Sequence, residues 1–213
     1  HDTRIVGSGT APVIKVQGDI SSGLVQISHL SITNGTVGIA GGSADLKIEH
    51  VVIYQIFGDG ILQDDGRLEA VNNTICHNTG YGITTQTPPA ETQLRNNLVG
   101  ENGAGIFFED GSLVEYNSAW GNYPDADFAP LTLGEGNGSG TSLFLDVAYG
   151  DYRVSAGSAG IDGANPVDTY DLEPTPNGSR RNQGAYGNTY WASTTDSNSG
   201  NVNNVLTPSS GGG

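Results

Sequence analysis

Three aspartates within seven residues are the densest group of side chains that could do hydrolytic chemistry. Asp59, Asp64 and Asp65 stand in the Gly-rich residues 58–66. Hydrolysis of a glycosidic bond uses two carboxyl groups, one as an acid and one as a base or nucleophile, at roughly 5 to 9 Å from each other. Asp and Gly also favour the backbone of turns. The sequence therefore leaves two interpretations of these residues, a catalytic carboxylate pair or a turn between strands.

A second acidic group stands further along the chain. Asp125, Asp127 and Glu135 lie in one stretch with Gly and Pro, where backbone carbonyl groups would be exposed. Carboxylates and carbonyl oxygens are the ligands that Ca²⁺ takes in proteins. The sequence contains no EF-hand and no Cys/His spacing typical of a zinc site. We expect no cofactor, with calcium at these three residues as the candidate exception.

Composition limits the classes of partner. The 213 residues include 8 Lys+Arg and 23 Asp+Glu, which gives a formal net charge of −15. Such an excess of acid repels the phosphate backbone, so nucleic acid is not an expected partner. No apolar run reaches the roughly 18 residues that span a bilayer, so we expect no membrane span. The acidic composition, poor in Lys and rich in Asn, Gly, Ser and Thr, favours an extracellular or cell-surface protein.

A repeat of about 22 residues must position these side chains. The dipeptides Gly38-Ile39, Gly60-Ile61, Gly82-Ile83 and Gly105-Ile106 are 22, 22 and 23 residues apart. A run of alternating apolar residues precedes each dipeptide. A period of two within this longer period predicts short strands stacked as a solenoid, with Val, Ile and Leu inside. Residues 5 to about 150 would make roughly six to seven coils.

Polar residues recur with the same period. His29, His50 and the pairs at residues 72–73 and 96–97 would form one row, and Asn34, Asn78 and Asn102 a second. Stacked strands are about 4.8 Å apart, so identical amides can hydrogen-bond from coil to coil. These rows predict polar ladders at the bends of the solenoid.

The repeats resemble those of a known family. Residues 72–83 and 96–106 are similar to repeats of right-handed parallel β-helix proteins, the pectate-lyase-like superfamily. Residues 158–164 and 183–186 look like the closing segment common in secreted bacterial β-helix proteins, although Gln183 replaces the family's usual acidic residue. The resemblance implies an all-β, single-stranded right-handed parallel β-helix over residues 1–150. A C-terminal closing segment, 151–192, and an extended Gly/Ser/Asn-rich tail, 193–213, would follow.

The resemblance leaves the function open, because the superfamily includes lyases, hydrolases, epimerases, adhesins and structural rods. Its lyases use a Lys or Arg base, for which Lys47, Arg67 and Arg95 are the candidates here. With Glu49 and Glu69 nearby, the same three residues also fit a surface row of salt bridges. In the closing segment, Asp162, Asp171 and Arg181 are expected to form a structural set of ion pairs and turn caps.

We expect a non-catalytic extracellular structural protein that assembles head-to-tail into a filament, tube or surface layer. Three features favour this hypothesis. No cap precedes the first coil, and no complete set of acid and base residues is evident. The low-complexity tail carries apolar anchors, Val202, Val205 and Leu206, that could add to a neighbour's sheet. The partner would be further copies of the chain. The alternatives are a polysaccharide-active lyase or hydrolase, and a carbohydrate-binding or adhesin module that belongs to a longer chain.

Overall fold

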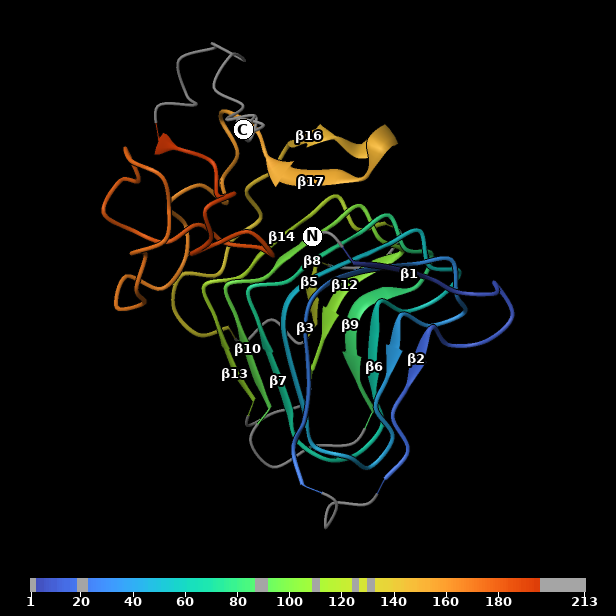
Figure 1. Cartoon of the computed structure of the whole chain (residues 1–213). Coiled ribbons are helices and arrows are strands. Elements are labelled where there is room, and N and C mark those ends of the chain that lie inside the picture. The colour runs from blue at the N-terminus through green and yellow to red at the C-terminus, as the bar shows by residue number, and fades with distance from the viewer. Residues whose placement is uncertain are drawn as a thin grey trace, which may run out of the picture.

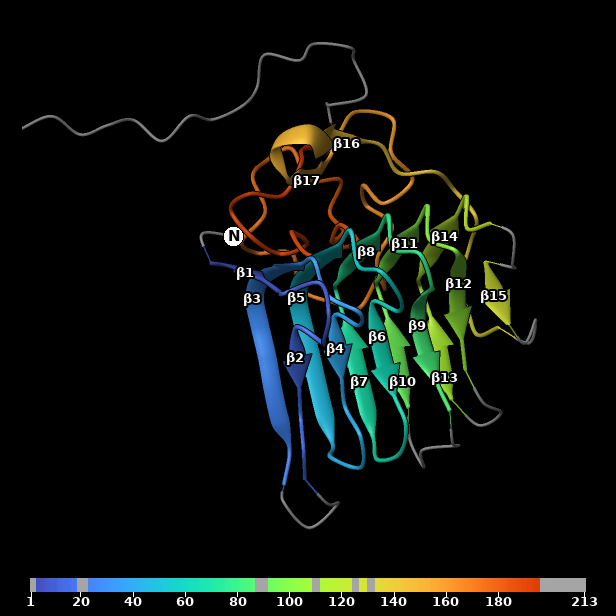
Figure 2. The same cartoon turned by 90° about the vertical axis from the view of Figure 1, so that its right-hand side faces the viewer.

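A computed structural model of the chain describes residues 3–18, 23–86, 92–108, 112–123, 127–129 and 133–195. Within this part, short strands wind repeatedly around one axis, as Figure 1 shows along the axis and Figure 2 from the side. No helix in these residues is long and apolar enough to cross a membrane. The strands are β1 Arg4–Val6, β2 Ile14–Lys15, β3 Val25–Thr33, β4 Ile39–Ala40, β5 Leu46–Tyr54, β6 Ile61–Gln63, β7 Leu68–Val71, β8 Thr74–Cys76, β9 Tyr81–Thr85, β10 Gln93–Arg95, β11 Leu98–Gly100, β12 Ala104–Phe107, β13 Leu113–Glu115, β14 Ser118–Trp120, β15 Phe128–Ala129, β16 Phe144–Asp146 and β17 Asp151–Val154.

The coils build three parallel sheets. The first sheet contains the first halves of the long strands β3 and β5, then β7, β10 and β13; the second contains β1, the second halves of β3 and β5, then β8, β11 and β14. The third sheet runs β2, β4, β6, β9, β12 and β15. A partial coil, β1–β2, thus precedes five full coils: β3–β4, β5–β6, β7–β9, β10–β12 and β13–β15. The predicted parallel β-helix is confirmed with slightly fewer coils, because residues after 140 leave the stack.

The Gly-Ile repeat marks one position of the third sheet. Ile39 pairs with Ile61, Ile61 with Ile83, and Ile106 with Ile83. Each of these side chains is 1% exposed or less and packs inside the coils with other Ile, Leu and Val residues. Gly60 precedes one of them because a Cβ there would lie 2.6 Å from the carbonyl oxygen of Gly82. The periodicity therefore predicted both the strands and the core.

Each coil bends twice through a left-handed backbone conformation. The first bend holds His29, His50, Asn72, Asn96 and Tyr116, with φ between 53° and 58°. The second bend holds Asn34, Gln55, His77 and Glu101, with φ between 52° and 62°, and then Gly121. Asn34 therefore belongs to this bend, where its side chain donates to Gly7 O, and not to the row of Asn78 and Asn102.

Two asparagine ladders follow the bends. In the first, Nδ2 of Asn73 donates to Oδ1 of Asn97 at 3.0 Å, and Nδ2 of Asn97 donates to Oδ1 of Asn117 at 2.9 Å. Asn117 continues to Asn137 at 3.0 Å. In the second ladder, Asn78, Asn102 and Asn122 are joined in the same way at 2.9 and 3.0 Å. The amides satisfy buried backbone groups at the bends, which polar side chains must do where water is excluded.

The predicted closing segment, residues 151–192, lies along the side of the rod together with the residues that flank it. Residues 142–195 include the antiparallel pair β16–β17, joined by a 3₁₀ turn at Val147–Tyr149, and then irregular backbone. They cover the outer face of the second sheet (Figure 2). Outward side chains of that sheet are consequently 5% exposed or less, among them Val52, Tyr54, Cys76, Leu98 and Trp120. Residues 196–213, including Val202, Val205 and Leu206, lie outside the described part.

Candidate functional site

The three basic candidates for catalysis all form ion pairs on the outer face of the first sheet. Lys47 Nζ lies 3.3 Å from Glu49 and 3.4 Å from Glu69, and an Arg67 nitrogen lies 3.5 Å from Glu69. Arg95 instead faces the closing segment, where a guanidinium nitrogen lies 3.6 Å from Asp168. These side chains form a surface row of ion pairs in which each basic residue has a carboxylate partner.

The electrostatics of Lys47 do not suit a general base. Burial lowers its pKa, but the carboxylates of Glu49 and Glu69 outweigh that effect, so the pKa lies above the ordinary value for lysine. A base that acts near neutral pH needs a lowered pKa. Lys47 is therefore held in its protonated form, as a partner in salt bridges.

The three aspartates of residues 58–66 do not gather at one place. Asp59 precedes β6 and accepts a hydrogen bond from Tyr81 N at 2.8 Å, and burial raises its pKa. Asp64 and Asp65 follow β6, where Gly66 has φ 78° and its N–H donates to Asp65 Oδ1. The strand separates Asp59 from Asp64 and Asp65 by on the order of 15 Å, at about 3.3 Å per residue. This exceeds the separation that a glycosidase pair needs.

Two of the three acidic residues proposed for calcium are described, and these two lie apart. Asp125 is outside the described residues. Asp127 ends the second asparagine ladder, where Oδ1 accepts from Asn122 Nδ2 at 2.7 Å, and Glu135 lies beside the first bend with Tyr116 Oη at 3.3 Å. In the described part of the chain, no three His, Cys, Asp or Glu residues converge as a metal site would need. Calcium binding stays an untested prediction.

The first bend is where the closing segment is docked. Asn72 is fully buried and its Nδ2 donates to the carbonyls of Asn182 and Gly184, each at 3.1 Å. Gly184 N in turn donates to Asn96 O at 2.9 Å. One coil earlier, His50 Nδ1 lies 3.1 Å from Ala185 O. The polar row predicted from the sequence therefore joins the coils to a segment that lies 88 to 135 residues further along the chain.

Arg181 is the basic residue of this junction. Its Nη1 donates to Asn72 Oδ1 at 3.1 Å and its Nε donates to Thr169 O at 2.6 Å. Its nearest carboxylate is Asp168, at 4.0 Å, whereas Asp171 is exposed. Asp162, the third predicted member, accepts from Thr195 Oγ1 at 3.0 Å and has a pKa raised by burial.

Glu173 is a structural residue that sequence reasoning missed. It is 5% exposed, and its Oε1 accepts from the backbone N–H groups of Asn182 and Asn188 at 2.8 and 2.7 Å. Burial raises its pKa to about 7, although those two hydrogen bonds act in the opposite direction. A single Glu before a proline, in a segment without periodicity, gives no signal in the sequence.

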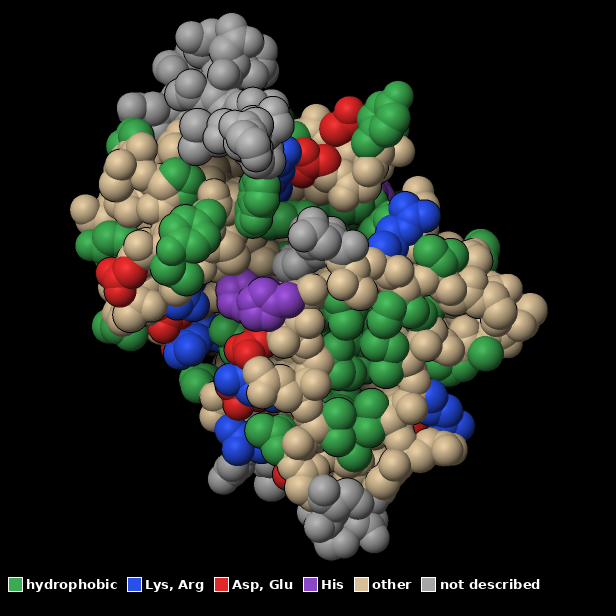
Figure 3. Space-filling model, in the orientation of Figure 1, with side chains coloured by type: hydrophobic (Ala, Val, Ile, Leu, Met, Phe, Trp, Pro, Cys, Tyr) green, Lys and Arg blue, Asp and Glu red, His purple; other side chains and the backbone are tan. Residues whose placement is uncertain are grey.

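The N-terminal end of the rod is open. β1 pairs with β3, β2 pairs with β4, and the first half of β3 pairs with β5; their other edges meet no strand among the described residues. The side chains of Val13, Ile14, Val16, Val25 and Leu30 pack on the core there but are only partly buried. Figure 3 views this end and shows apolar side chains gathered between β2 and β3.

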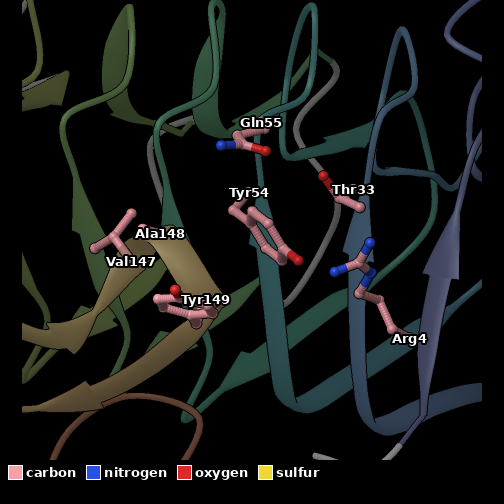
Figure 4. Close-up of a pocket in the computed structure, with 8 residues that line it drawn as sticks. Arg4, Thr33, Tyr54, Gln55, Val147, Ala148 and Tyr149 are labelled. Carbon is pink, nitrogen blue, oxygen red and sulfur yellow. The ribbon is translucent and has the colours of Figure 1, made fainter.

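A solvent-open pocket of about 280 Å³ lies beside this end. Figure 4 shows it between the ends of β1, β3 and β5 and the turn that joins β16 to β17. Arg4, Thr33, Tyr54, Gln55 and Tyr149 contribute polar groups to its lining. The Arg4 side chain makes no ion pair or hydrogen bond within the described ranges, and the ring of Tyr149 is almost fully exposed.

The C-terminal end of the rod is different. Residues 134–138 lie along the last coil, with hydrogen bonds from Gly134 N to Val114 O, from Tyr116 N to Glu135 O, and from Gly138 N to Asn117 O. Leu133 packs against the core, and Asn137 completes the first ladder. The backbone groups of β13 and β14 are therefore partly paired, so the two ends present unlike surfaces.

Comparison with known families agrees with this architecture. Residues 12–138 match the family described as right handed beta helix region. The match covers more than half of the chain, so the chain belongs to the right-handed β-helix family. Searches of curated proteins and of solved structures returned no significant match.

Proposed function

We propose that the protein is a non-catalytic extracellular structural protein whose rods join end to end. The open N-terminal end carries this proposal. Within the described residues, three strand edges whose N–H and C=O groups meet no other strand surround a partly buried apolar interior at that end. Such an edge is a template for pairing with another strand, and covering the apolar side chains removes their contact with water.

The state of the reactive side chains supports the same proposal. Lys47, Arg67 and Arg95 are neutralised by carboxylates, and Asp59 lies at the opposite end of β6 from Asp64. A polysaccharide lyase would need an unprotonated base beside a groove, and a hydrolase would need two converging carboxyl groups. Release of unsaturated products or of reducing ends from acidic polysaccharides would favour the enzyme over the structural protein.

The chain beyond residue 195 is the second component that we propose for assembly. Val202, Val205 and Leu206 are the apolar residues of this stretch, which could add as a strand to an open edge of a neighbouring rod. Deletion of residues 196–213 should then shorten the assemblies or abolish them. Assemblies of unchanged length from the truncated chain would remove the tail from the mechanism.

The open end itself is tested by adding charge to it. Val6 and Leu24 are 54% and 55% exposed, so Val6→Lys and Leu24→Lys together should leave the fold intact while placing charge on the proposed contact. Val167→Lys, at an exposed apolar position of the closing segment, is the matched control. Sedimentation velocity should show association of the native chain and the control, but not of the double variant. Equal association of all three chains would exclude the N-terminal end.

A further inference from the structure

The basic residues of the rod are distributed unevenly between its two ends. Arg4 on β1 and Lys15 on β2 are exposed, and neither side chain has an ion pair or hydrogen bond within the described ranges. The other six basic residues all have partners: Lys47, Arg67, Arg95, Arg153, Arg180 and Arg181. Among the described residues, the two basic side chains without a partner therefore stand on the first, partial coil, whereas Arg180, bonded to backbone carbonyls, lies over the ring of Tyr116 in the last coil.

Acidic residues predominate at the opposite end. The sequence holds no Lys or Arg between Arg95 and Arg153. The described residues of the last coils and of the segment over them include four acidic residues: Glu101, Glu115, Asp127 and Glu135. Among those described, Glu135 is exposed on the segment that lies over the last coil, where only the Tyr116 hydroxyl contacts its carboxylate. The rod thus carries a charge asymmetry along its axis.

We propose that this asymmetry fixes the direction of assembly, with the Arg4–Lys15 end of one copy facing the acidic end of the next. The inference rests on the proposed end-to-end association and names its partner, a second copy of the chain. Electrostatic complementarity selects among possible partners, because juxtaposed like charges oppose association. A head-to-head pair would bring Arg4 and Lys15 of two copies together, and a tail-to-tail pair would bring two acidic ends together.

The unlike shapes of the two ends agree with this direction. In the part of the chain that the structure describes, the outer edges of β1, β2 and β3 pair with no strand at the N-terminal end, whereas residues 134–138 lie over the last coil at the other end. A contact between unlike surfaces does not close on itself in the manner of a two-fold dimer. Repeated by the same operation, it generates an open filament.

Two charge reversals separate the possible arrangements. The head variant is Arg4→Glu with Lys15→Glu, and the tail variant is Glu135→Lys. In a head-to-tail assembly, each variant alone should associate at least about tenfold more weakly than the native chain, because its substituted side chains meet like charges across the contact. An equimolar mixture of the two variants should recover association, since both contacts between unlike copies become attractive. Asp171→Lys makes the same charge change as Glu135→Lys at an exposed position of the closing segment, and should leave association unchanged.

Sedimentation equilibrium of each chain and of the mixtures gives the readout, and thermal melts verify that all variants fold. The two arrangements predict different results for the tail variant alone, because a head-to-head contact does not contain Glu135 and the tail variant would then associate like the native chain. That result would overturn the inference while leaving end-to-end association in place, as would an unchanged association constant for the variants. A native chain that stays monomeric at every concentration would overturn the proposed function as well.

Discussion

The side chain of Gln183 joins the closing segment to the last coil through Tyr116. Gln183 Nε2 donates to the backbone carbonyl of Tyr116 at 2.6 Å, while its Oε1 accepts from Ser118 Oγ at 2.7 Å. The residue is 3% exposed, so these bonds replace water on both sides of the amide. The amide fits this position because it can donate and accept at once, which an ionised carboxylate cannot do.

Replacement of Gln183 by Glu should therefore destabilise the protein at neutral pH. A carboxylate would place a buried negative charge against the Tyr116 carbonyl, and loss of that one hydrogen bond should cost about 1 to 3 kcal/mol in the free energy of unfolding. Protonation restores a donor, so the loss should shrink as the pH is lowered towards 5. Urea unfolding of both chains at several pH values measures this. A constant difference between the chains at all pH values would contradict the assignment of the donor.

The asparagine ladder gives a prediction on cooperativity within the rod. Asn97 accepts from Asn73, donates to Asn117, and donates to Ala70 O at 2.8 Å. Asn97→Ala should lower the free energy of unfolding by about 2 to 4 kcal/mol, because buried donors and acceptors on both sides lose their partner. Asn137→Ala, at the end of the ladder, is the control and should cost less. Equal losses at the two positions would mean that stacking within the ladder adds nothing.

Glu173 predicts a pH dependence with a defined sign. Burial raises its pKa from the ordinary 4.5 to about 7, so the folded chain holds this proton more tightly than the unfolded chain. The stabilisation is complete below about pH 4.5 and is lost as the pH rises through about 7. Glu173→Gln keeps an acceptor for Asn182 and Asn188 without the charge. The free energy of unfolding of this variant should exceed that of the native chain by on the order of 2 kcal/mol at pH 8, with little difference at pH 4.

Asp162 and Arg181 also influence the Glu173 carboxyl, so the comparison is made between two chains that share those groups. Differential scanning calorimetry from pH 4 to pH 8 provides the curves. A native chain whose stability rises more steeply with pH than that of Glu173→Gln would contradict a raised pKa at Glu173.

A glycosylation sequon, Asn72-Asn73-Thr74, gives a further prediction. Asn72, in the sequon of residues 72–74, is fully buried with its Nδ2 engaged by two carbonyls of the closing segment. A glycan there would displace residues 182–184 from the coils. If the chain is expressed through a glycosylating secretory pathway, glycopeptides of Asn72 should occur only in the unfolded fraction, as mass spectrometry of folded and aggregated material would show. Folded protein that carries an Asn72 glycan would contradict the packing of the closing segment.

Local periodicity made the coils predictable from the sequence. The Gly-Ile dipeptides and the Asn rows repeat once in each coil, so equivalent residues of successive coils lie next to each other. The prediction that Asn34 joins the row of Asn78 and Asn102 is wrong. Its residue type matches that row, but it lies at the second left-handed bend. The turn at Gly66 followed from its composition.

The side of the rod on which the closing segment lies was not predictable. Its contacts join residues such as Asn72 and Gly184, and no repeat relates the two parts of the chain. The outward apolar residues Val52 and Leu98 gave a hint, since strands buried on both faces lose the alternation of polar and apolar residues. Asp168 and Glu173 stand in irregular backbone, where only the folded structure shows which carboxylate meets which donor.

Negative-stain electron microscopy of the native protein at neutral pH tests the central claim most directly, with and without calcium. Head-to-tail stacking of six coils, partial coil included, predicts filaments with an axial repeat of roughly 30 Å, because coils are spaced by about 4.8 Å. Single dispersed rods at every protein concentration would contradict end-to-end association and return attention to the charged face of the first sheet.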